Sequence, residues 1–331
     1  MRQTLPTVEA FVQGIRSGDR VLLGKAITLV ESTRPDHQAV ARDIIARLLA
    51  ESPDSAGSLR IAVTGAPGVG KSTFIEALGI HLTKLGKRVA VLAIDPTSSI
   101  SKGSILGDKT RMERLSTSEM AFIRPSPSGT SLGGVARKTR ETILLVEAAG
   151  YETVLIETVG VGQSEIAAHS MTDVFLLLLL PGAGDELQGI KRGIVEMADI
   201  LAVNKADGDR VQLADQARSY YRNATHLLPQ KPSGWTPRVL TCSAEQGQGI
   251  ETVWDTILDF KQAADANGFF GANRKKQAGY WLHEALQSGL QNAFFNHKSV
   301  QDTLTALEPD VLAGRMSPFA AAEQVLAVFL K

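Results

Sequence analysis

Residues 65–72 read GAPGVGKS and match the pattern G-x-x-x-x-G-K-S, which is typical of loops that bind nucleotide phosphates. Glycines let backbone N–H groups turn toward phosphate oxygens, while the Lys71 ammonium reaches the terminal phosphates and the Ser72 hydroxyl binds Mg²⁺. A strand pattern precedes the loop and a helical pattern follows it, as this chemistry requires. We expect the phosphates to contact Gly65, Ala66, Pro67, Gly68, Val69, Gly70, Lys71, Ser72 and Thr73.

A second motif, NKAD at residues 204–207, predicts which base is bound. In GTPases with this phosphate loop, an N-K-x-D motif at a strand end reads guanine. The carboxylate accepts hydrogen bonds from the ring N–H and the exocyclic amine, which adenine cannot supply. We therefore assign base reading to Asp207, with Asn204 and Lys205 shaping the pocket. Because an unpaired buried carboxylate is costly, the preference for GTP over ATP should be large.

The segment CSAEQG at residues 242–247 follows another strand pattern and completes the predicted base site. Ser243 and Ala244 are expected to contact the base through their backbone. Cys242 is read as a small buried strand residue rather than as a redox group or cobalt ligand.

The acidic side chain of Glu157 follows an apolar strand pattern, at the place where nucleoside triphosphatases hold Mg²⁺ or its waters. Gly160 is placed to give its N–H to a γ-phosphate and to lose that contact on hydrolysis. No glutamine follows Gly160 directly, so whether Gln163 orients the attacking water stays open. A glutamate that is simply solvated is the alternative, which the nearby phosphate loop disfavours. Intrinsic hydrolysis should be slow, in the range of ~10⁻⁴–10⁻³ per second.

Two further carboxylates are candidates for the metal. Asp95 ends the strand pattern that follows the phosphate-loop helix, within range of Mg²⁺ or its waters. Asp108 lies in a polar segment beyond it and would have to move in when nucleotide binds.

Short β-branched runs alternate with helical patterns from Leu59 to about Phe260, which predicts an α/β fold with a mainly parallel sheet flanked by helices. The pattern is that of a P-loop NTPase, with strands expected at 60–65, 88–95, 120–125, 153–158, 174–180, 199–205 and 238–243. We divide the chain into an N-terminal helical arm (1–56), a nucleotide-binding domain (57–265) and a C-terminal helical arm (266–331).

The C-terminal arm is expected to form one long amphipathic helix and two shorter ones, around 299–308 and 317–330. An apolar face of the long helix carries Trp281, Leu282, Leu286, Leu290, Phe294 and Phe295. This face either packs against the parent domain or forms a dimer interface, and its composition alone favours neither.

Composition excludes several classes of protein. Of 331 residues, 35 are Lys or Arg and 35 are Asp or Glu, so nothing in the charge favours nucleic acid or an anionic membrane. The most apolar run, at 174–180, is far shorter than the ~20 residues of a membrane-spanning helix. A single cysteine excludes an internal disulfide and suits a reducing compartment, so a cytoplasmic location is expected.

Five segments in this order, GAPGVGKST, AIDPTSS with GSILGDKTRM, ETVGVGQSE, LPGAGDELQGIKRGI and NKAD, resemble the MeaB/ArgK family, the methylmalonyl-CoA mutase-associated GTPases. The resemblance spans about residues 10–330. It implies a homodimer that uses the C-terminal arm as its interface. It also implies GTP and GDP as ligands with Mg²⁺, and an adenosylcobalamin-dependent methylmalonyl-CoA mutase as partner. GTP binding and hydrolysis would gate cofactor loading and protect the mutase from inactivation.

The resemblance further implies that residues 181–193 form an extra switch loop, which relays the nucleotide state to the mutase. Glycines and charges of both signs in this segment suit such a switch, although a solvated loop would look the same. Lys191 or Arg192 could approach the phosphates once the partner docks, as an arginine finger does.

Two alternatives belong to other functional classes. A P-loop kinase linked to amino-acid transport would need a base placed for an acceptor hydroxyl, and no such constellation is evident. A metallochaperone GTPase usually recruits clustered Cys and His ligands. This chain has one Cys and six scattered His, with His169 and His283 read as ordinary helix residues.

Overall fold

The computed structural model describes residues 5–51, 57–94, 112–125, 132–158, 164–182 and 192–330. Contacts within the chain group it into two compact units, Met1–Gln277 and Ala278–Lys331, which are described separately. Five predicted site residues lie outside the described residues: Asp95, Asp108, Gly160, Gln163 and Lys191. Arg192 begins a helix, but its side chain is also outside the description.

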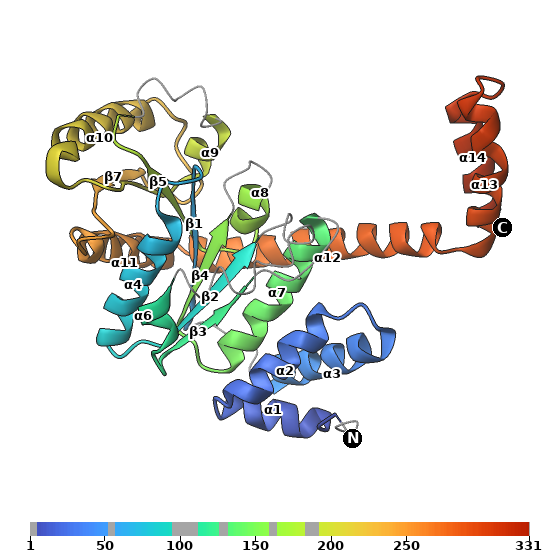
Figure 1. The fold of residues 1–331 in the computed structure, drawn as a ribbon, viewed down its shortest axis with the longest axis horizontal. Helices are drawn as coiled ribbons and strands as arrows, with labels where there is room; N and C mark the ends of the chain where they lie inside the picture. The colour runs from blue at the N-terminus through green and yellow to red at the C-terminus, as the bar shows by residue number, and fades with distance from the viewer. Residues whose placement is uncertain are drawn as a thin grey trace. The chain divides into compact units, whose positions relative to one another are not determined.

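The first unit is built on a sheet of seven described strands in the order β3-β2-β4-β1-β5-β6-β7, every pair of which is parallel (Figure 1). The seven strand predictions and the parallel sheet are confirmed. The strands are β1 (Leu59–Gly65), β2 (Val89–Ile94), β3 (Ala121–Arg124), β4 (Thr153–Thr158), β5 (Val174–Leu179), β6 (Ile200–Val203) and β7 (Arg238–Thr241).

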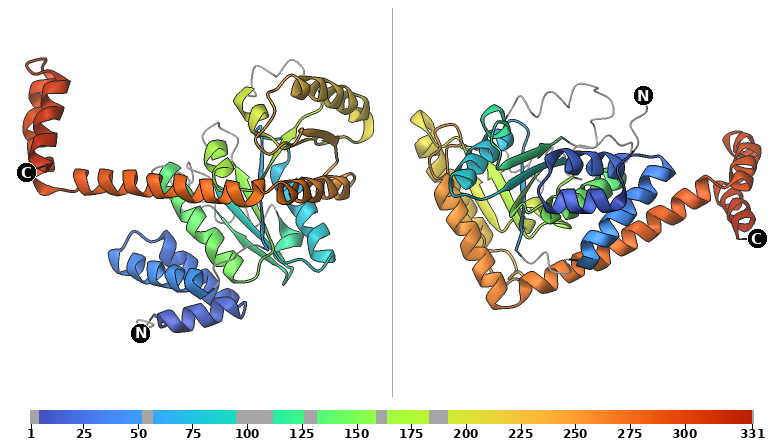
Figure 2. Two further views of the ribbon diagram at one scale, coloured as in Figure 1. Left: turned by 180° about the vertical axis from the view of Figure 1, so that it is seen from behind. Right: turned by 90° about the horizontal axis from the view of Figure 1, so that it is seen from below.

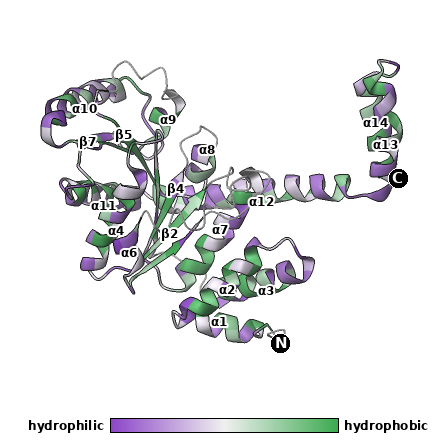
Figure 3. Cartoon of the chain, viewed as in Figure 1, coloured by the Kyte–Doolittle hydropathy of each residue, from purple (hydrophilic) through white to green (hydrophobic). Residues whose placement is uncertain are grey.

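Burial explains why these sequences form central strands. Every residue of β1 and β5 is buried, and Figure 3 shows the inner strands as strongly hydrophobic. Strands covered on both faces need continuous apolar runs rather than an alternating pattern. The run at 174–180, which was too short to cross a membrane, is this kind of strand. No helix among the described residues combines the length and apolar character that crossing a bilayer requires.

Helices cover both faces of the sheet. On one face, α4 (Lys71–Lys84) contacts both α6 (Glu113–Ser116) and α11 (Ile250–Ala266). On the opposite face lie α7 (Leu132–Ala148) and α8 (Ser164–His169), as the further views in Figure 2 also show for cyan α4 and green α7. Beyond β5, the short α9 (Arg192–Met197) contacts that strand, and α10 (Val211–His226) packs on β6 and β7.

The N-terminal helices α1 (Val8–Arg16), α2 (Arg20–Glu31) and α3 (Pro35–Glu51) pack on one another and on α7. Their starts follow from capping residues, because Thr7 accepts from the N–H of Ala10, and Asp19 accepts from the first turn of α2. An ion pair between Glu31 and Arg124 joins α2 to the end of β3. The N-terminal segment, which was expected to be helical, thus forms three helices among its described residues.

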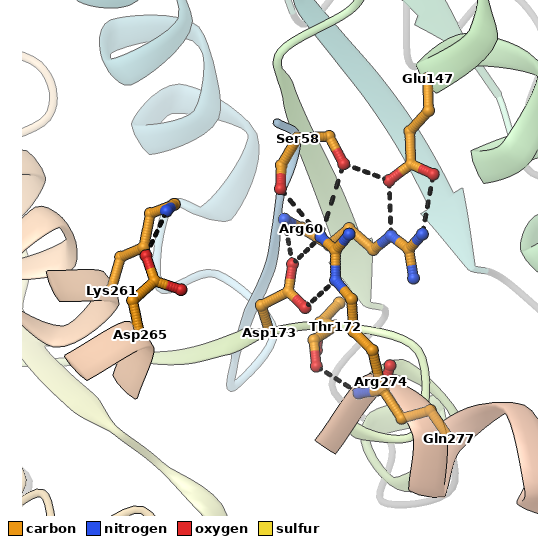
Figure 4. Close-up of polar contacts among 9 residues, drawn as sticks. All are labelled: Ser58, Arg60, Glu147, Thr172, Asp173, Lys261, Asp265, Arg274 and Gln277. Atoms are coloured by element: carbon orange, nitrogen blue, oxygen red, sulfur yellow. Dashed lines mark hydrogen bonds and ion pairs between the residues drawn. The ribbon is translucent and has the colours of Figure 1, made fainter. Parts of the chain in front are cut away.

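A buried polar network lies where β1 begins (Figure 4). The Arg60 guanidinium donates to both oxygens of Glu147, at 2.6 and 2.7 Å, with both side chains almost fully buried. Arg274 of α12 (Phe269–Phe295) donates to both oxygens of Asp173, at 2.8 and 2.7 Å, and to the carbonyl of Ser58 at 2.8 Å. The backbone N–H of Arg60 also donates to Asp173 at 2.9 Å. The network therefore ties the first residues of α12 to two strands and to α7.

The second unit contains the remainder of α12 together with α13 (Lys298–Leu312) and α14 (Pro318–Phe329), as predicted. The helices α13 and α14 pack together, and Phe294 contacts Phe329 edge to face. Leu282, Leu286 and Leu290 are 57 to 64% exposed and recur every four residues, so they share one face of the helix. The division of the chain into three parts at residues 56 and 265 stays a prediction.

Candidate functional site

The phosphate loop joins β1 to α4, and three of its positions have a positive φ that favours glycine. Gly65, Gly68 and Gly70 have φ values of 147°, 79° and 94°. A Cβ on Gly65 would lie 2.5 Å from the carbonyl oxygen of Leu178, and one on Gly70 would lie 2.8 Å from Nδ2 of Asn204. The loop therefore approaches strand β5 and Asn204, the residue after β6, too closely for side chains at Gly65 and Gly70.

Lys71 lies inside this loop and is only 9% exposed. Its Nζ donates to the carbonyl oxygens of Gly65, at 2.9 Å, and Ala66, at 3.1 Å. Burial lowers the pKa of the Lys71 ammonium, while the carboxylates of Glu157 and Glu165 act in the opposite direction. A bound phosphate would offer this ammonium stronger acceptors than the two carbonyls.

Ser72 and Glu157 meet at the mouth of the sheet. The Ser72 hydroxyl, in the first turn of α4, donates to Glu157 Oε1 at 2.7 Å. Strand pairing brings them together, because β1 and β4 are parallel neighbours with Val63 opposite Glu157. A hydroxyl and a carboxylate are the hard oxygen ligands that Mg²⁺ prefers, so this pair fits the predicted metal. The described residues hold no cluster of three or more His, Cys, Asp or Glu side chains suited to a metal ion, so phosphate oxygens and waters would have to complete the shell.

On the base side, the Asn204 side chain bonds to the phosphate loop and to the segment after β7. Its Nδ2 donates to the carbonyl of Val69 at 2.9 Å, and its Oδ1 accepts from the N–H of Ala244 at 3.0 Å. The side chain is 1% exposed. Asn204 therefore holds the phosphate loop to the segment that follows β7.

Lys205 adds a second link between the two halves of the site. Its φ of 59° is the one positive value at a non-glycine residue among the described part of the chain. This left-handed backbone turns the side chain so that its Nζ donates to the carbonyl of Gly68 at 2.8 Å. The aliphatic part of Lys205 thus lies along the phosphate loop.

Asp207 carries the charge that should read guanine. Its Oδ2 accepts from the Ser243 hydroxyl at 2.5 Å, and its Oδ1 accepts from Arg210 Nη2 at 2.6 Å. Hydrogen bonds from Ser243 first and from Arg210 second lower the pKa of the Asp207 carboxyl. The carboxylate is therefore held ionised, as an acceptor of two N–H groups must be.

The predicted residues that the structure describes thus form one continuous edge. Residues 65–73, Glu157, the NKAD motif and Ser243 with Ala244 all lie at or next to the carboxyl ends of β1, β4, β6 and β7. Ligands of open α/β sheets bind at such an edge. Cys242 is buried as predicted, and burial raises its thiol pKa to about 12.

Two residues at this site were missed in the sequence. Arg210 was overlooked although its spacing of three from Asp207 is a signal for a local ion pair. Glu165 is 1% exposed, and its Oε1 accepts no hydrogen bond from the described residues, although its carboxylate acts to raise the pKa of Lys71. An acid in a helix turn gives no sequence signal for such burial.

Comparison with known proteins shows which family the sequence resembles. The family model described as "Methylmalonyl Co-A mutase-associated GTPase MeaB" matches residues 23–299. A Caulobacter vibrioides protein is 50% identical over 322 residues, which cover 97% of this chain and 98% of that protein. The GTPase ArgK of Escherichia coli is 44% identical, covering 93% of this chain and 94% of its own.

A solved structure is similar over the full length. The crystal structure of an LAO/AO transport system kinase has a TM-score of 0.77 and 36% sequence identity, and covers 99% of this chain and 100% of its own. The mouse protein "Methylmalonic aciduria type A homolog, mitochondrial" is 44% identical over 97% of this chain and 79% of its own.

Proposed function

Because the chain belongs to the MeaB family of methylmalonyl Co-A mutase-associated GTPases, we propose that its GTP hydrolysis serves an adenosylcobalamin-dependent methylmalonyl-CoA mutase. Hydrolysis would gate cofactor loading and guard the mutase against inactivation. The family match over residues 23–299 carries this proposal. The bond from Asn204 of the NKAD motif to Val69 of the phosphate loop supports it. The chain is a GTP hydrolase, as its relatives are.

The residues of the chain divide the work on GTP. Backbone N–H groups of the loop from Gly65 to Thr73 would bind the phosphates, and Lys71 would leave its two carbonyl acceptors for the terminal phosphates. Ser72 and Glu157 would hold Mg²⁺, which neutralises charge on the phosphate oxygens when it is bound. Asp95 and Asp108 remain further metal candidates. Gly160 remains the proposed γ-phosphate sensor, and Gln163 and Lys191 remain candidates for positioning water and stabilising charge.

Base recognition would rest on Asp207, with Ser243 fixing one oxygen of its carboxylate. Asn204 and Lys205 would keep the base half and the phosphate half of the site at a fixed separation, because each bonds to the phosphate loop. Ala244 would then be fixed for a backbone contact to the base through its bond to Asn204.

We also propose that the chain forms a homodimer through the C-terminal arm in the cytoplasm. The exposed face with Leu282, Leu286 and Leu290 supports the dimer, since a leucine stripe of this kind suits burial against a second helix. Light scattering of the purified protein should give twice the mass of one chain. A Leu286→Arg variant should shift it toward the mass of one chain.

The mutase proposal is tested by release of free phosphate from GTP with and without an adenosylcobalamin-dependent methylmalonyl-CoA mutase. We expect the mutase to accelerate release in the wild-type protein, while a Lys71→Ala variant stays inactive in both cases. If no concentration of the mutase accelerates phosphate release, the link to the mutase is contradicted, while the GTPase activity itself is not. Transfer of labelled γ-phosphate to an acceptor instead of water would support the kinase alternative.

A further inference from the structure

The guanine-reading carboxylate is fixed at both of its oxygens. Ser243 donates to Asp207 Oδ2, and Arg210 donates to Oδ1 through Nη2. The backbone brings the Arg210 side chain close to Asp207, because the N–H of Arg210 donates to the carbonyl of Asp207 at 3.0 Å in the 3₁₀ turn η2 (Gly208–Arg210). The turn therefore folds the guanidinium back over the carboxylate.

An ionised carboxylate has about four lone-pair sites, two on each oxygen. Ser243 and Arg210 occupy one site on each oxygen, so one site on each oxygen is left. Guanine presents two parallel donors, its ring N–H and its 2-amino group. The remaining acceptor sites, one on each oxygen, equal these donors in number.

We propose that Arg210 is a positioning residue for base specificity, which holds the plane of the Asp207 carboxylate so that both oxygens face the guanine donors together. This inference rests on the proposed guanine site. The torsion that rotates a carboxylate about its Cβ–Cγ bond is soft and broad. With Ser243 as its one remaining donor, Asp207 would keep one oxygen in place and lose the orientation of the other.

A neighbouring ion pair shows that this is more than a helix-surface contact. Arg218 and Asp215 in α10 have the same spacing of three residues, at 3.2 Å. Asp215 is 52% exposed, whereas Asp207 is 18% exposed and also bound by Ser243. Arg218 is therefore a matched control: it has the same charge and the same spacing from its acid, and the described residues place no second donor on Asp215.

Two features of the site decide what should be measured. The base lies at the end of the nucleotide away from the γ-phosphate, so Arg210 should act equally on GDP and GTP. Inosine nucleotides lack the 2-amino group and therefore use only one of the two carboxylate oxygens. Loss of Arg210 should thus weaken GDP more than IDP.

The experiment measures dissociation constants for GDP, IDP and ADP, and the KM and kcat for GTP, in wild-type, Arg210→Ala, Arg210→Lys and Arg218→Ala proteins. For Arg210→Ala we expect GDP binding about 3- to 10-fold weaker, a smaller ratio of IDP to GDP dissociation constants, and a raised KM with kcat within about 2-fold. Arg210→Lys should restore part of the GDP affinity, because a lysine keeps the charge but not the planar donors. Arg218→Ala should bind as the wild type does.

Unchanged or tighter GDP binding in Arg210→Ala would overturn the inference, and tighter binding would mean that the guanidinium competes with the base. An equal loss for GDP, IDP and ADP would also overturn it, since a loosened fold acts on all three nucleotides. The same Arg210→Ala change in an Asp207→Asn protein should have no further effect on the IDP to GDP ratio. If the wild-type protein itself shows no preference for GDP over ADP, the proposed guanine site fails and the role of Arg210 falls with it, whereas a wild-type preference that Arg210→Ala leaves unchanged overturns the role of Arg210 alone.

Discussion

The Ser72 hydroxyl and the Glu157 carboxylate lie 2.7 Å apart although 85 residues separate them in the chain. Ser72 lies in the first turn of α4, the helix that follows β1, and Glu157 lies in β4, the strand paired beside β1. Their bond therefore joins the phosphate loop to the strand end that leads into the segment expected to sense the γ-phosphate.

A Glu157→Gln variant tests the metal role of this pair. The amide keeps the size of the side chain but loses the charge, so we expect kcat to fall by about 100-fold or more. The Mg²⁺ concentration needed for half-maximal GTP binding should rise, because an amide is the weaker ligand. Fluorescent nucleotide binding at a series of Mg²⁺ concentrations measures this directly. Glu152→Gln, at an exposed glutamate in the same region of sequence, should change neither quantity.

Gly70 and Gly68 provide a matched pair for the loop. Both have positive φ, so alanine at either position costs about 1–2 kcal/mol of backbone strain. Only at Gly70 does the new Cβ strike another side chain, that of Asn204, 2.8 Å away. Gly70→Ala should therefore weaken GDP binding at least ~10-fold more than Gly68→Ala. Calorimetric titration of both variants with GDP measures this difference. Equal losses of GDP affinity would mean that the contact of the loop with Asn204 does not contribute to binding.

An Asp207→Asn variant tests base reading by exchanging an acceptor for a donor. The amide should repel the guanine donors and accept xanthine, which carries a carbonyl in place of the 2-amino group. We expect GDP binding to weaken by ~100-fold or more and the ratio of XDP to GDP affinity to rise. Competition between the two nucleotides measures this ratio. A variant that keeps its preference for GDP would place base recognition elsewhere.

The buried pair of Arg60 and Glu147 predicts a stability effect far from the nucleotide. Glu147→Gln leaves a buried guanidinium close to two other arginines, Arg140 and Arg274. Breaking one partner of a buried pair costs about 3–5 kcal/mol, so the urea midpoint should fall sharply. Arg315→Ala, which removes an exposed ion pair, should cost less than about 1 kcal/mol.

Cys242 predicts how stability depends on alkaline pH. Its thiol pKa rises from 9.0 to about 12 through burial, so above pH 9 the unfolded thiol ionises while the native one keeps its proton. The free energy of unfolding should therefore fall as pH rises above 9, by up to about 1.4 kcal/mol per pH unit from this group. Urea unfolding at pH 8, 9 and 10 should show a steeper loss in the wild type than in Cys242→Ala. Equal slopes would show that the native thiol ionises normally.

Local patterns were sufficient for much of this fold and failed where contacts span the chain. The strands were predictable because each is a short apolar run, and the phosphate loop because its residues act as one contiguous segment. The hydrogen bonds of Asn204 to Val69 and Ala244 were not predictable from the sequence. These partners lie 135 and 40 residues away, and only the order of the strands brings them close to Asn204. The buried network around Arg60 was not predicted, because its partners are also distant in the sequence.

The order of the sheet also sets when a growing chain can first use GTP. The strand β1 lies between β4 and β5, so the phosphate loop that follows β1 lacks a neighbouring strand until β5 has been synthesised up to Leu179. The base side comes later still, because Ser243 pairs with Gln248. Parallel neighbours of this kind are joined by long crossovers and assemble slowly. A nascent chain that ends before Gln248 therefore lacks part of the proposed base site, and we expect it to bind GTP more weakly than the finished protein does.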